Sequence, residues 1–413
     1  MMERRVVVTG LGAITPIGNN TKEFWKGIVD GKCGIDEITL FDTSKYKVKL
    51  AGEIKNYNPE EHFDKKASKR LDRYTQLAMI AAREAMADSK IDMEKEDATR
   101  FGVAISSGIG GLQSIESNVI TLYEKGPDRV SPMYIPMAIS NMATGNVAIE
   151  IGAKGESFCM TTACASATHT IGECYRIIKH GYQDVMITGG TEASITPTGI
   201  SGFTNIKALS QTQDKTRASI PFDKERNGFV MGEGAGLIIL EELEHARKRG
   251  AKIYAEIVGY GASSDAYHIT SPAPEGEGGA RAMENAIKDA NLKPEEITYI
   301  NAHGTSTHLN DSCETSAIKK ALGEASKKVM VSSTKGHTGH LLGAAGGVEA
   351  IVCVKAIDEG IVPPTIGYKV PDEECDLDIV PNKARKAEVT VAMSNSLGFG
   401  GHNSSIIFKK YED

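Results

Sequence analysis

The chain has 413 residues, of which 40% are apolar and 24% are charged, and its formal net charge is −7. This composition is typical of a globular protein with a large core, and the charge gives no reason to expect a nucleic acid or an anionic membrane as partner. No apolar run approaches the roughly 18 residues of a membrane-spanning helix. The amino terminus has no signal-peptide core, and the seven cysteines form neither a disulfide framework nor a CxxC zinc pattern. We therefore expect a cytoplasmic protein in a reducing compartment.

Short apolar runs typical of strands alternate with helical patterns along the chain. The strand-like runs cover residues 5–10, 102–107, 184–190, 234–241, 253–259, 297–301, 329–332 and 404–409. Helical patterns lie at residues 74–88, 167–178, 242–249 and 279–290 and in the residues before Gly360. The alternation predicts an α/β fold with buried, largely parallel sheets. Two stretches, 206–224 and 263–279, are rich in small and polar residues and are expected to be long surface loops of the kind that flank active sites.

The two halves of the chain show a weak internal repeat. In the first half a strand-like run leads to Cys164 and to a helix that stops at Gly181. In the second half a strand leads to Lys335, His340 and a helix that stops at Gly360. Duplicated halves facing each other would bring the two helix starts together at a pseudo-twofold axis. A series of α/β units without duplication is the alternative.

Cys164 is the candidate nucleophile. It comes just before the helical pattern 167–178, and its neighbours are small enough to leave room for a substrate. At a helix start the free N–H groups and the positive end of the dipole favour a thiolate, so we predict a depressed pKa for Cys164. A buried and inert structural cysteine is the alternative.

Two histidines follow strand-like runs in the second half. His303 comes after residues 297–301, and His340 comes after Lys335 at the start of the last long helical pattern. The carboxyl ends of strands are where α/β folds collect their sites, and a cysteine with two histidines suits acyl-thioester chemistry. We expect His340 to be neutral, because a helix start disfavours its cation, and so able to donate a hydrogen bond to a developing enolate. A structural histidine is the alternative for each residue taken alone.

A glycine-rich stretch near the carboxyl terminus, residues 395–403, places Phe399 among three glycines. Such a loop can bring backbone N–H groups to a substrate and can also move. An ordinary turn before the last strand is the alternative.

Four stretches together resemble the signature motifs of the beta-ketoacyl-acyl-carrier-protein synthases. They are residues 162–166 around Cys164, 301–307 around His303, 333–340 with Lys335 and His340, and 398–401 around Phe399. The resemblance runs from residue 5 to residue 409 in the same order. Residues 107–111 are more similar to the elongating synthase II branch than to synthase I.

The resemblance implies a thiolase-like α/β fold with two pseudo-twofold-related, αβαβα-layered halves. Residues 1–252 would carry the nucleophile and residues 253–413 the two histidines. It implies a decarboxylative condensation in fatty acid elongation, in which an acyl group on Cys164 reacts with malonyl-acyl-carrier protein to give 3-oxoacyl-acyl-carrier protein and carbon dioxide. Both substrates bring phosphopantetheine on the carrier protein, so no separate cofactor is expected. The protein is expected to be a homodimer, and a metal is left open.

The resemblance also assigns roles to single residues. The backbone N–H groups of Cys164 and Phe399 would form an oxyanion hole, and Phe399 would gate the pocket. His303 and His340 would hold the malonyl thioester oxygen, and Lys335 with Glu349 would orient them. The residues expected to contact substrate are Thr305 and Thr307 on the phosphopantetheine arm, with Ile109 and Gly400. Leu397 and His402 stand where relatives often carry Phe and Thr.

The acidic carrier protein is expected to dock on a local basic patch, because the chain itself is net negative. The densest basic cluster is Lys65, Lys66, Lys69, Arg70 and Arg73. The spacing of Lys66, Lys69, Arg70 and Arg73 predicts that these four side chains share one face of a helix running to residue 88. The resemblance adds Lys207 beside the pocket mouth. A solvated helix face is the alternative.

Other functions share parts of this pattern. A chain-length-factor-like subunit would lack the nucleophile, and a degradative thiolase would carry a second cysteine near the carboxyl terminus, which this glycine-rich stretch lacks. A cysteine hydrolase also uses Cys and His and would release free acid without malonyl. A non-catalytic carrier-binding module is a further alternative.

Overall fold

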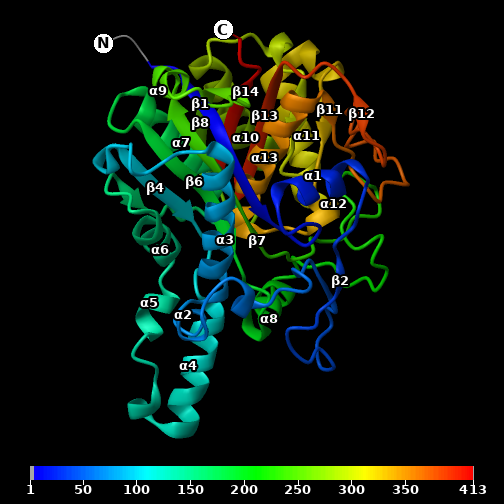
Figure 1. Cartoon of the computed structure of the whole chain (residues 1–413). Helices are drawn as coiled ribbons and strands as arrows, with labels where there is room; N and C mark the ends of the chain where they lie inside the picture. The colour runs from blue at the N-terminus through cyan, green and yellow to red at the C-terminus, as the bar shows by residue number, and fades with distance from the viewer. Residues whose placement is uncertain (1–3, 413) are drawn as a thin grey trace.

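The strands of the computed structural model, which describes residues 4–412, form one large mixed sheet (Figure 1). Its ten strands follow the order β10-β9-β13-β14-β8-β1-β7-β6-β4-β5. Those of the first half are β1 (Val6–Ile14), β4 (Phe101–Ser106), β5 (Ser157–Phe158), β6 (Val185–Glu192) and β7 (Gly234–Glu242). Those of the second half are β8 (Ala255–Ser264), β9 (Tyr299–Asn301), β10 (Met330–Ser332), β13 (Val391–Gly398) and β14 (His402–Lys409). Short pairs are formed by β2 (Asp36–Glu37) with β3 (Leu50–Ala51) and by β11 (Ile361–Val362) with β12 (Arg385–Lys386).

The two halves of this sheet repeat one topology. The order β5-β4-β6-β7-β1 of the first half matches β10-β9-β13-β14-β8 of the second, and the halves meet where β1 pairs antiparallel with β8. In each half three strands are parallel, and the two that follow are antiparallel to their neighbours. The expectation of largely parallel sheets is therefore only half right. The matching order favours duplication over an unrelated series of α/β units.

The helices complete five layers. On the outer face of the first half lie α3 (Arg73–Ser89) and α6 (Met142–Ile151), and on that of the second half lie α10 (Glu277–Asp289) and α11 (His308–Leu322). Between the two halves lie α7 (Ser166–Lys179) and α13 (Ala345–Glu359), which touch each other and strands of both halves (Figure 1). The remaining helices are α1 (Thr21–Val29), α2 (Lys65–Ser68), α4 (Leu112–Lys125), α5 (Tyr134–Ala138), α8 (Pro197–Asn205), α9 (Leu243–Lys248) and α12 (Lys335–Thr338). This is the αβαβα thiolase-like arrangement.

The middle layer packs closely because small residues face each other. A Cβ atom on Gly346 of α13 would lie 2.0 Å from the Oγ1 atom of Thr168 on α7, a distance at which something must shift. Ile171 and Cys174 of α7 and Ile351 of α13 belong to one buried apolar cluster. The buried helices α7 and α13 are thereby fixed against each other, and so are the segments that lead into them.

Strand β13 is absent from the sequence prediction, which placed residues 395–403 in a loop. The strand is hard to recognise because Ser394, Asn395 and Ser396 lie in it, fully buried, between β9 and β14. The true turn is confined to residues 399–401, where Gly400 and Gly401 adopt φ values of +84° and +74°. Among residues 4–412, no helix combines the length and apolar content needed to cross a membrane.

Candidate active site

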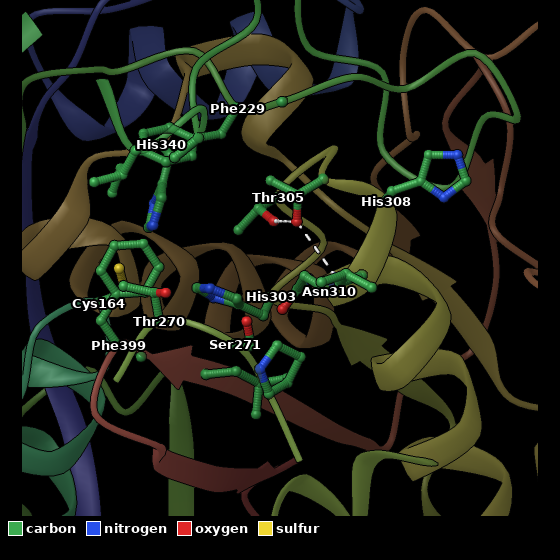
Figure 2. A pocket seen from close by; sticks show the side chains of 18 of the residues that line it. Cys164, Phe229, Thr270, Ser271, His303, Thr305, His308, Asn310, His340 and Phe399 are labelled. Carbon is green, nitrogen blue, oxygen red and sulfur yellow. Dashed lines mark hydrogen bonds between the residues drawn. The ribbon is translucent and has the colours of Figure 1, made fainter. Parts of the chain in front are cut away.

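One cavity of about 540 Å³ contains the predicted nucleophile and both predicted histidines (Figure 2). Cys164, His303, His340 and Phe399 line its inner end, and Thr305 and Thr307 line it further out. Both stretches predicted as active-site loops contribute to the wall, through Ile206 to Ala208 and through Thr270 to Pro272. The cavity wall is mostly apolar and carries a small number of polar groups, as is usual for small-molecule binding sites.

Cys164 sits on a sharp turn before α7. The preceding Ala163 has φ +51°, and the N–H groups of Ala165 and Ser166 donate to the carbonyl oxygens of Thr162 and Ala163. A positive φ is uncommon for alanine and persists only where the surroundings hold it. The turn projects the cysteine into the cavity instead of into the helix, whose first residue is Ser166.

The predicted depression of the Cys164 pKa is wrong for this structure. Burial raises the pKa of the thiol to about 12, although the Lys335 charge and the backbone N–H of Phe399 act in the opposite direction. The helix dipole does not overcome this loss of hydration, since the sulfur lies before the helix at the bottom of a mostly apolar cavity. Cys164 therefore rests as a neutral thiol, with its side chain still partly exposed to the cavity.

His303 and His340 face each other beside the sulfur. Their ring centroids lie 5.2 Å apart at an interplanar angle of 85°, and a ring nitrogen of each lies with the Cys164 sulfur in a group whose members are all within 4.8 Å. Figure 2 shows both rings pointing toward Cys164. Among residues 4–412 these three form the one His/Cys/Asp/Glu group of three or more placed closely enough to hold a metal ion.

Both histidines are held neutral. Burial lowers their pKa values well below the usual range, and the nearby Lys335 ammonium lowers them further. The neutral state expected for His340 is thus correct, but its cause is not a helix start. His340 follows the short helix α12, which ends at Thr338, and α13 begins only at Ala345.

Lys335 lies behind the histidines in a buried ion pair. Its ammonium donates to a carboxylate oxygen of Glu349 at 2.5 Å and to the carbonyl oxygen of His303 at 2.5 Å, and both charged side chains are 2% exposed. The predicted pairing of Lys335 with Glu349 is present. It fixes the backbone at His303 directly and places a positive charge behind both rings.

Glu314 on α11 was missed by the sequence analysis. Its carboxylate accepts hydrogen bonds from the N–H groups of His303 and Gly304, both at 2.7 Å, and burial raises its pKa to about 7. No local pattern marks this residue, because its partners lie ten and eleven positions earlier in a different element. The only signal in the sequence was a glutamate close to the histidine stretch.

Phe399 lies at the turn between β13 and β14. Its backbone N–H is directed at the Cys164 sulfur, and its ring centroid is 6.3 Å from that of Phe203 across the cavity. The turn is tied to the loop after β8, since the N–H of Gly400 donates to the carbonyl of Ile269 and the N–H of Asp265 donates to that of Gly401. The glycine turn and this loop are therefore connected through their backbones.

The predicted substrate contacts divide into two groups. Thr305 and Thr307 line the cavity with their hydroxyl oxygens 3.0 Å apart. Ile109 and Gly400 are not among the lining residues. Ile109 packs behind the wall in a cluster with Phe203 and Phe229, which do line the cavity.

The basic cluster does not form one helix face. Asp64 caps α2 and Asp72 caps α3, so the chain breaks between Lys69 and Arg73. Arg73 turns inward to Glu233, whose side chain is fully buried. The exposed members are Lys65, Lys66, Lys69 and Arg70. Lys207 is exposed at the cavity mouth, where it also borders a groove with Lys45 and Lys47.

Comparisons with known proteins agree with this geometry. Residues 3–246 match the family model "Beta-ketoacyl synthase, N-terminal domain", and residues 254–369 match "Beta-ketoacyl synthase, C-terminal domain". The chain belongs to the beta-ketoacyl synthase family. It is 55% identical over 409 residues to 3-oxoacyl-[acyl-carrier-protein] synthase 2 of Staphylococcus aureus (strain COL), covering 99% of both chains. It is 53% identical over 411 residues to the protein of the same name from Synechocystis sp., again covering 99% of each.

Solved structures show the same fold. A chain from the solved structure of a type II PKS acyl-carrier protein in complex with its ketosynthase bound to the hexaketide superposes with a TM-score of 0.93 at 34% identity, covering 99% of this chain and 100% of that one. A beta-ketoacyl synthase from Burkholderia phymatum STM815 superposes with a TM-score of 0.91 at 32% identity, with the same coverage. The family resemblance, the thiolase-like fold and the activity class, a condensing ketosynthase acyltransferase, are confirmed.

Proposed function

We propose that this ketosynthase extends fatty acyl chains by condensing an acyl group, held on Cys164, with malonyl-acyl-carrier protein. The observation that carries the proposal is the convergence of one thiol and two neutral imidazoles in one mostly apolar cavity. The relatives named 3-oxoacyl-[acyl-carrier-protein] synthase 2 support the same substrates. Each substrate brings its phosphopantetheine arm with it, and the proposal needs no further cofactor.

In the first half-reaction the Cys164 sulfur attacks the acyl thioester carbonyl. Because the thiol rests protonated, its proton has to leave as the carbon–sulfur bond forms, and the neutral imidazoles within 4.8 Å are the nearest bases. The backbone N–H groups of Cys164 and Phe399 hold the oxygen of the tetrahedral intermediate. The intermediate collapses to acyl-Cys164, and the carrier thiol leaves with the proton.

In the second half-reaction His303 and His340 hold the malonyl thioester oxygen. Each neutral ring can donate one N–H hydrogen bond, which stabilises the enolate as the carboxylate leaves as carbon dioxide. The enolate carbon then attacks the carbonyl of acyl-Cys164, and the cysteine sulfur leaves as a thiolate that takes a proton from the solvent. Lys335 contributes indirectly, because its charge favours the neutral form of both rings in the resting site and its bond to the His303 carbonyl fixes one of them.

The outer cavity is proposed to hold the phosphopantetheine arm. Thr305 and Thr307 present hydroxyl groups to it, and Arg226 supports this segment by donating to the carbonyl oxygens of Thr307 and His308. Ile109, which packs behind Phe203, is proposed to shape the part of the cavity that holds the acyl chain. Gly400 is proposed to allow the turn at Phe399 to move. Neither role requires the residue to line the cavity.

The carrier protein is proposed to dock on the basic residues Lys65, Lys69, Arg70 and Lys207. All four are exposed, and Lys207 lies at the mouth that the arm must enter. The groove beside it is lined by Lys45 and Lys47 and by no acidic residue, which extends the positive surface around the mouth. An acidic carrier is attracted to such a rim mainly through its association rate.

We also propose that the chain forms a homodimer. Each subunit would consist of two halves, residues 1–252 and residues 253–413. The boundary falls just before β8, which begins at Ala255.

Helices α4 and α5 project away from the body (Figure 1). They and α6 expose a series of large apolar side chains, namely Val119, Ile120, Leu122, Tyr123, Ile135, Ile139 and Ile149. Exposure on this scale marks a surface that another chain covers.

The proposed function is tested by supplying the purified protein with acyl-carrier protein and malonyl-carrier protein and resolving the products by mass. We expect a 3-oxoacyl-carrier protein two carbons longer than the starting acyl group, together with carbon dioxide. Free fatty acid in place of the extended product would indicate a hydrolase. Carrier binding without any turnover would indicate a non-catalytic module.

A further inference from the structure

The three side chains at the inner end of the cavity are also a set of metal ligands. Cys164 offers a sulfur and His303 and His340 each offer a ring nitrogen, and these atoms lie within 4.8 Å of one another. Thiolate and imidazole are the ligands that zinc takes in proteins. Within the part of the chain that the structure describes, no second group of this kind exists.

Three of the four nitrogens of these imidazoles are buried without a partner in the protein. His303 and His340 are 2% and 1% exposed, yet Nδ1 of His303 and both nitrogens of His340 form no hydrogen bond. Buried polar atoms are nearly always paired, so unpaired nitrogens on two rings beside one sulfur indicate that a ligand binds among the three side chains. Figure 2 shows the two rings directed at the Cys164 side chain.

The spacing is close to that of a zinc site. With Zn–S of about 2.3 Å and Zn–N of about 2.0–2.1 Å, tetrahedral ligands lie about 3.3–3.6 Å apart. Atoms now within 4.8 Å therefore need to move inward by less than about 1 Å each, which small side-chain rotations provide. The cavity supplies the route to the site and leaves the fourth position open to water or to a substrate atom.

We propose that Cys164, His303 and His340 bind a zinc ion reversibly and that the bound ion inhibits the enzyme. The ion exchanges water molecules for the sulfur and the two nitrogens, and the thiol proton passes to the solvent. Inhibition follows because the ion occupies the nucleophile and the nitrogens that face the substrate. This inference goes beyond the proposed function, since it needs only the arrangement of the three groups.

The surroundings argue for a weak site. Zinc-bound histidines usually donate their second N–H to a carboxylate or carbonyl, and loss of such a partner typically costs about 10–100-fold in affinity. His340 has no such partner on either nitrogen. The Lys335 ammonium also lies nearby, although Glu349 balances its charge. The ion is therefore an inhibitor that comes and goes and not a resident structural metal.

Cobalt(II) is the probe for the test, because it enters zinc sites and reports its ligands by absorption. Chelator-treated protein is titrated with Co²⁺, and we expect visible bands of a tetrahedral site together with a sulfur-to-cobalt charge-transfer band. Zn²⁺ should abolish both. Over the same range Zn²⁺ should slow alkylation of Cys164 and decarboxylation of malonyl-carrier protein, and a chelator should restore them.

Variants locate the site. Cys164→Ser keeps the size of the side chain and should lose the charge-transfer band, and His340→Ala should weaken cobalt binding by more than about 100-fold, beyond the loss of an outer partner. Cys33→Ser, at an exposed cysteine, should behave as wild type. A charge-transfer band that persists in Cys164→Ser would overturn the proposal. So would its absence from wild type, or zinc inhibition without a cobalt signal, which would place the ion elsewhere.

Discussion

The two halves of the molecule share one strand order, but they carry different chemical groups where the chain enters the middle helices α7 and α13. In the first half the chain turns sharply at Ala163 and sets Cys164 two residues before α7. In the second half a short helix, α12, is inserted before α13, and it carries Lys335 inward before the chain reaches His340. The common topology places both segments at one cavity. The insertion supplies the Lys335 charge that lies behind the two histidines.

This difference shows how a duplicated fold divides a reaction. The half with the plain turn provides the nucleophile, and the half with the inserted helix provides two histidines and the Lys335–Glu349 pair that keeps them neutral. The shared sheet sets the positions of the site residues, whereas local burial and charge set their protonation states. If substitutions in the two sets of residues affect the same half-reaction, the two halves do not divide the reaction in this way.

The largest expected effect is a split between half-reactions. His303→Ala or His340→Ala should slow decarboxylation of malonyl-carrier protein by about 10²–10³-fold, as for loss of one oxyanion donor, while Cys164 still accepts an acyl group. Cys164→Ala should show the reverse pattern, with acyl transfer abolished and decarboxylation retained. Carbon dioxide release and acylation of the protein are measured separately. Wild-type decarboxylation in either histidine variant would contradict the role given to that residue.

A second prediction concerns the buried pair that distinguishes the second half. Lys335→Met leaves Glu349 without a partner and should lower the free energy of unfolding by about 3–5 kcal/mol. The matched control is the pair of Lys327 with Glu324, whose side chains are 72% and 89% exposed. Lys327→Met should leave the free energy of unfolding almost unchanged, because both of these charges are solvated. Denaturant titrations of both variants measure the difference, and equal losses would show that the buried pair has no special weight.

A third prediction sharpens the account of the nucleophile. Because burial raises the pKa of Cys164 to about 12, the thiolate fraction should grow about tenfold for each pH unit between pH 7 and pH 9. Alkylation of the Cys164 peptide by iodoacetamide, followed by mass mapping, should rise over this range without levelling off. A model cysteine peptide, with a pKa of about 8.5, should bend toward a plateau. A plateau for Cys164 below pH 8 would restore the activated thiolate expected from the sequence.

The smallest expected effect lies outside the comparison, at the cavity mouth. Changing Lys65, Lys69 and Lys207 to Glu should raise the apparent KM for acyl-carrier protein several-fold at low salt, with less effect at high salt, while small thioesters still acylate Cys164 normally. Reversal of Lys288, Lys293 and Lys327, exposed residues at the opposite ends of the strands, changes the net charge equally and serves as the control. Equal behaviour of the two triple variants would place the carrier elsewhere.

Much of the site was predictable because its residues lie in short motifs at strand ends. Cys164, His303 and His340 stand beside glycines and small residues, where a sequence pattern survives. The residues that were missed or misplaced depend on distant partners. Glu314 is defined by backbone groups of another element, and Arg73 turns inward because Glu233, 160 positions away, is buried beneath it.

The same limit explains the errors in protonation and in strand assignment. The pKa of Cys164 depends on how deeply the whole cavity buries the sulfur, which the helix-start position does not reveal. Strand β13 contains polar residues that are buried by neighbouring strands, so its sequence has no apolar alternation. Local patterns predicted where the chemistry lies, and tertiary packing decided its electrostatic state.

The account is tested most directly by following the Cys164 peptide by mass through one turnover. Wild-type protein given acyl-carrier protein alone should gain one acyl group on that peptide. Addition of malonyl-carrier protein should then remove the group and yield a 3-oxoacyl product two carbons longer. An acyl group on another residue, or its release as free acid when malonyl-carrier protein is added, would contradict the division of labour between the two halves.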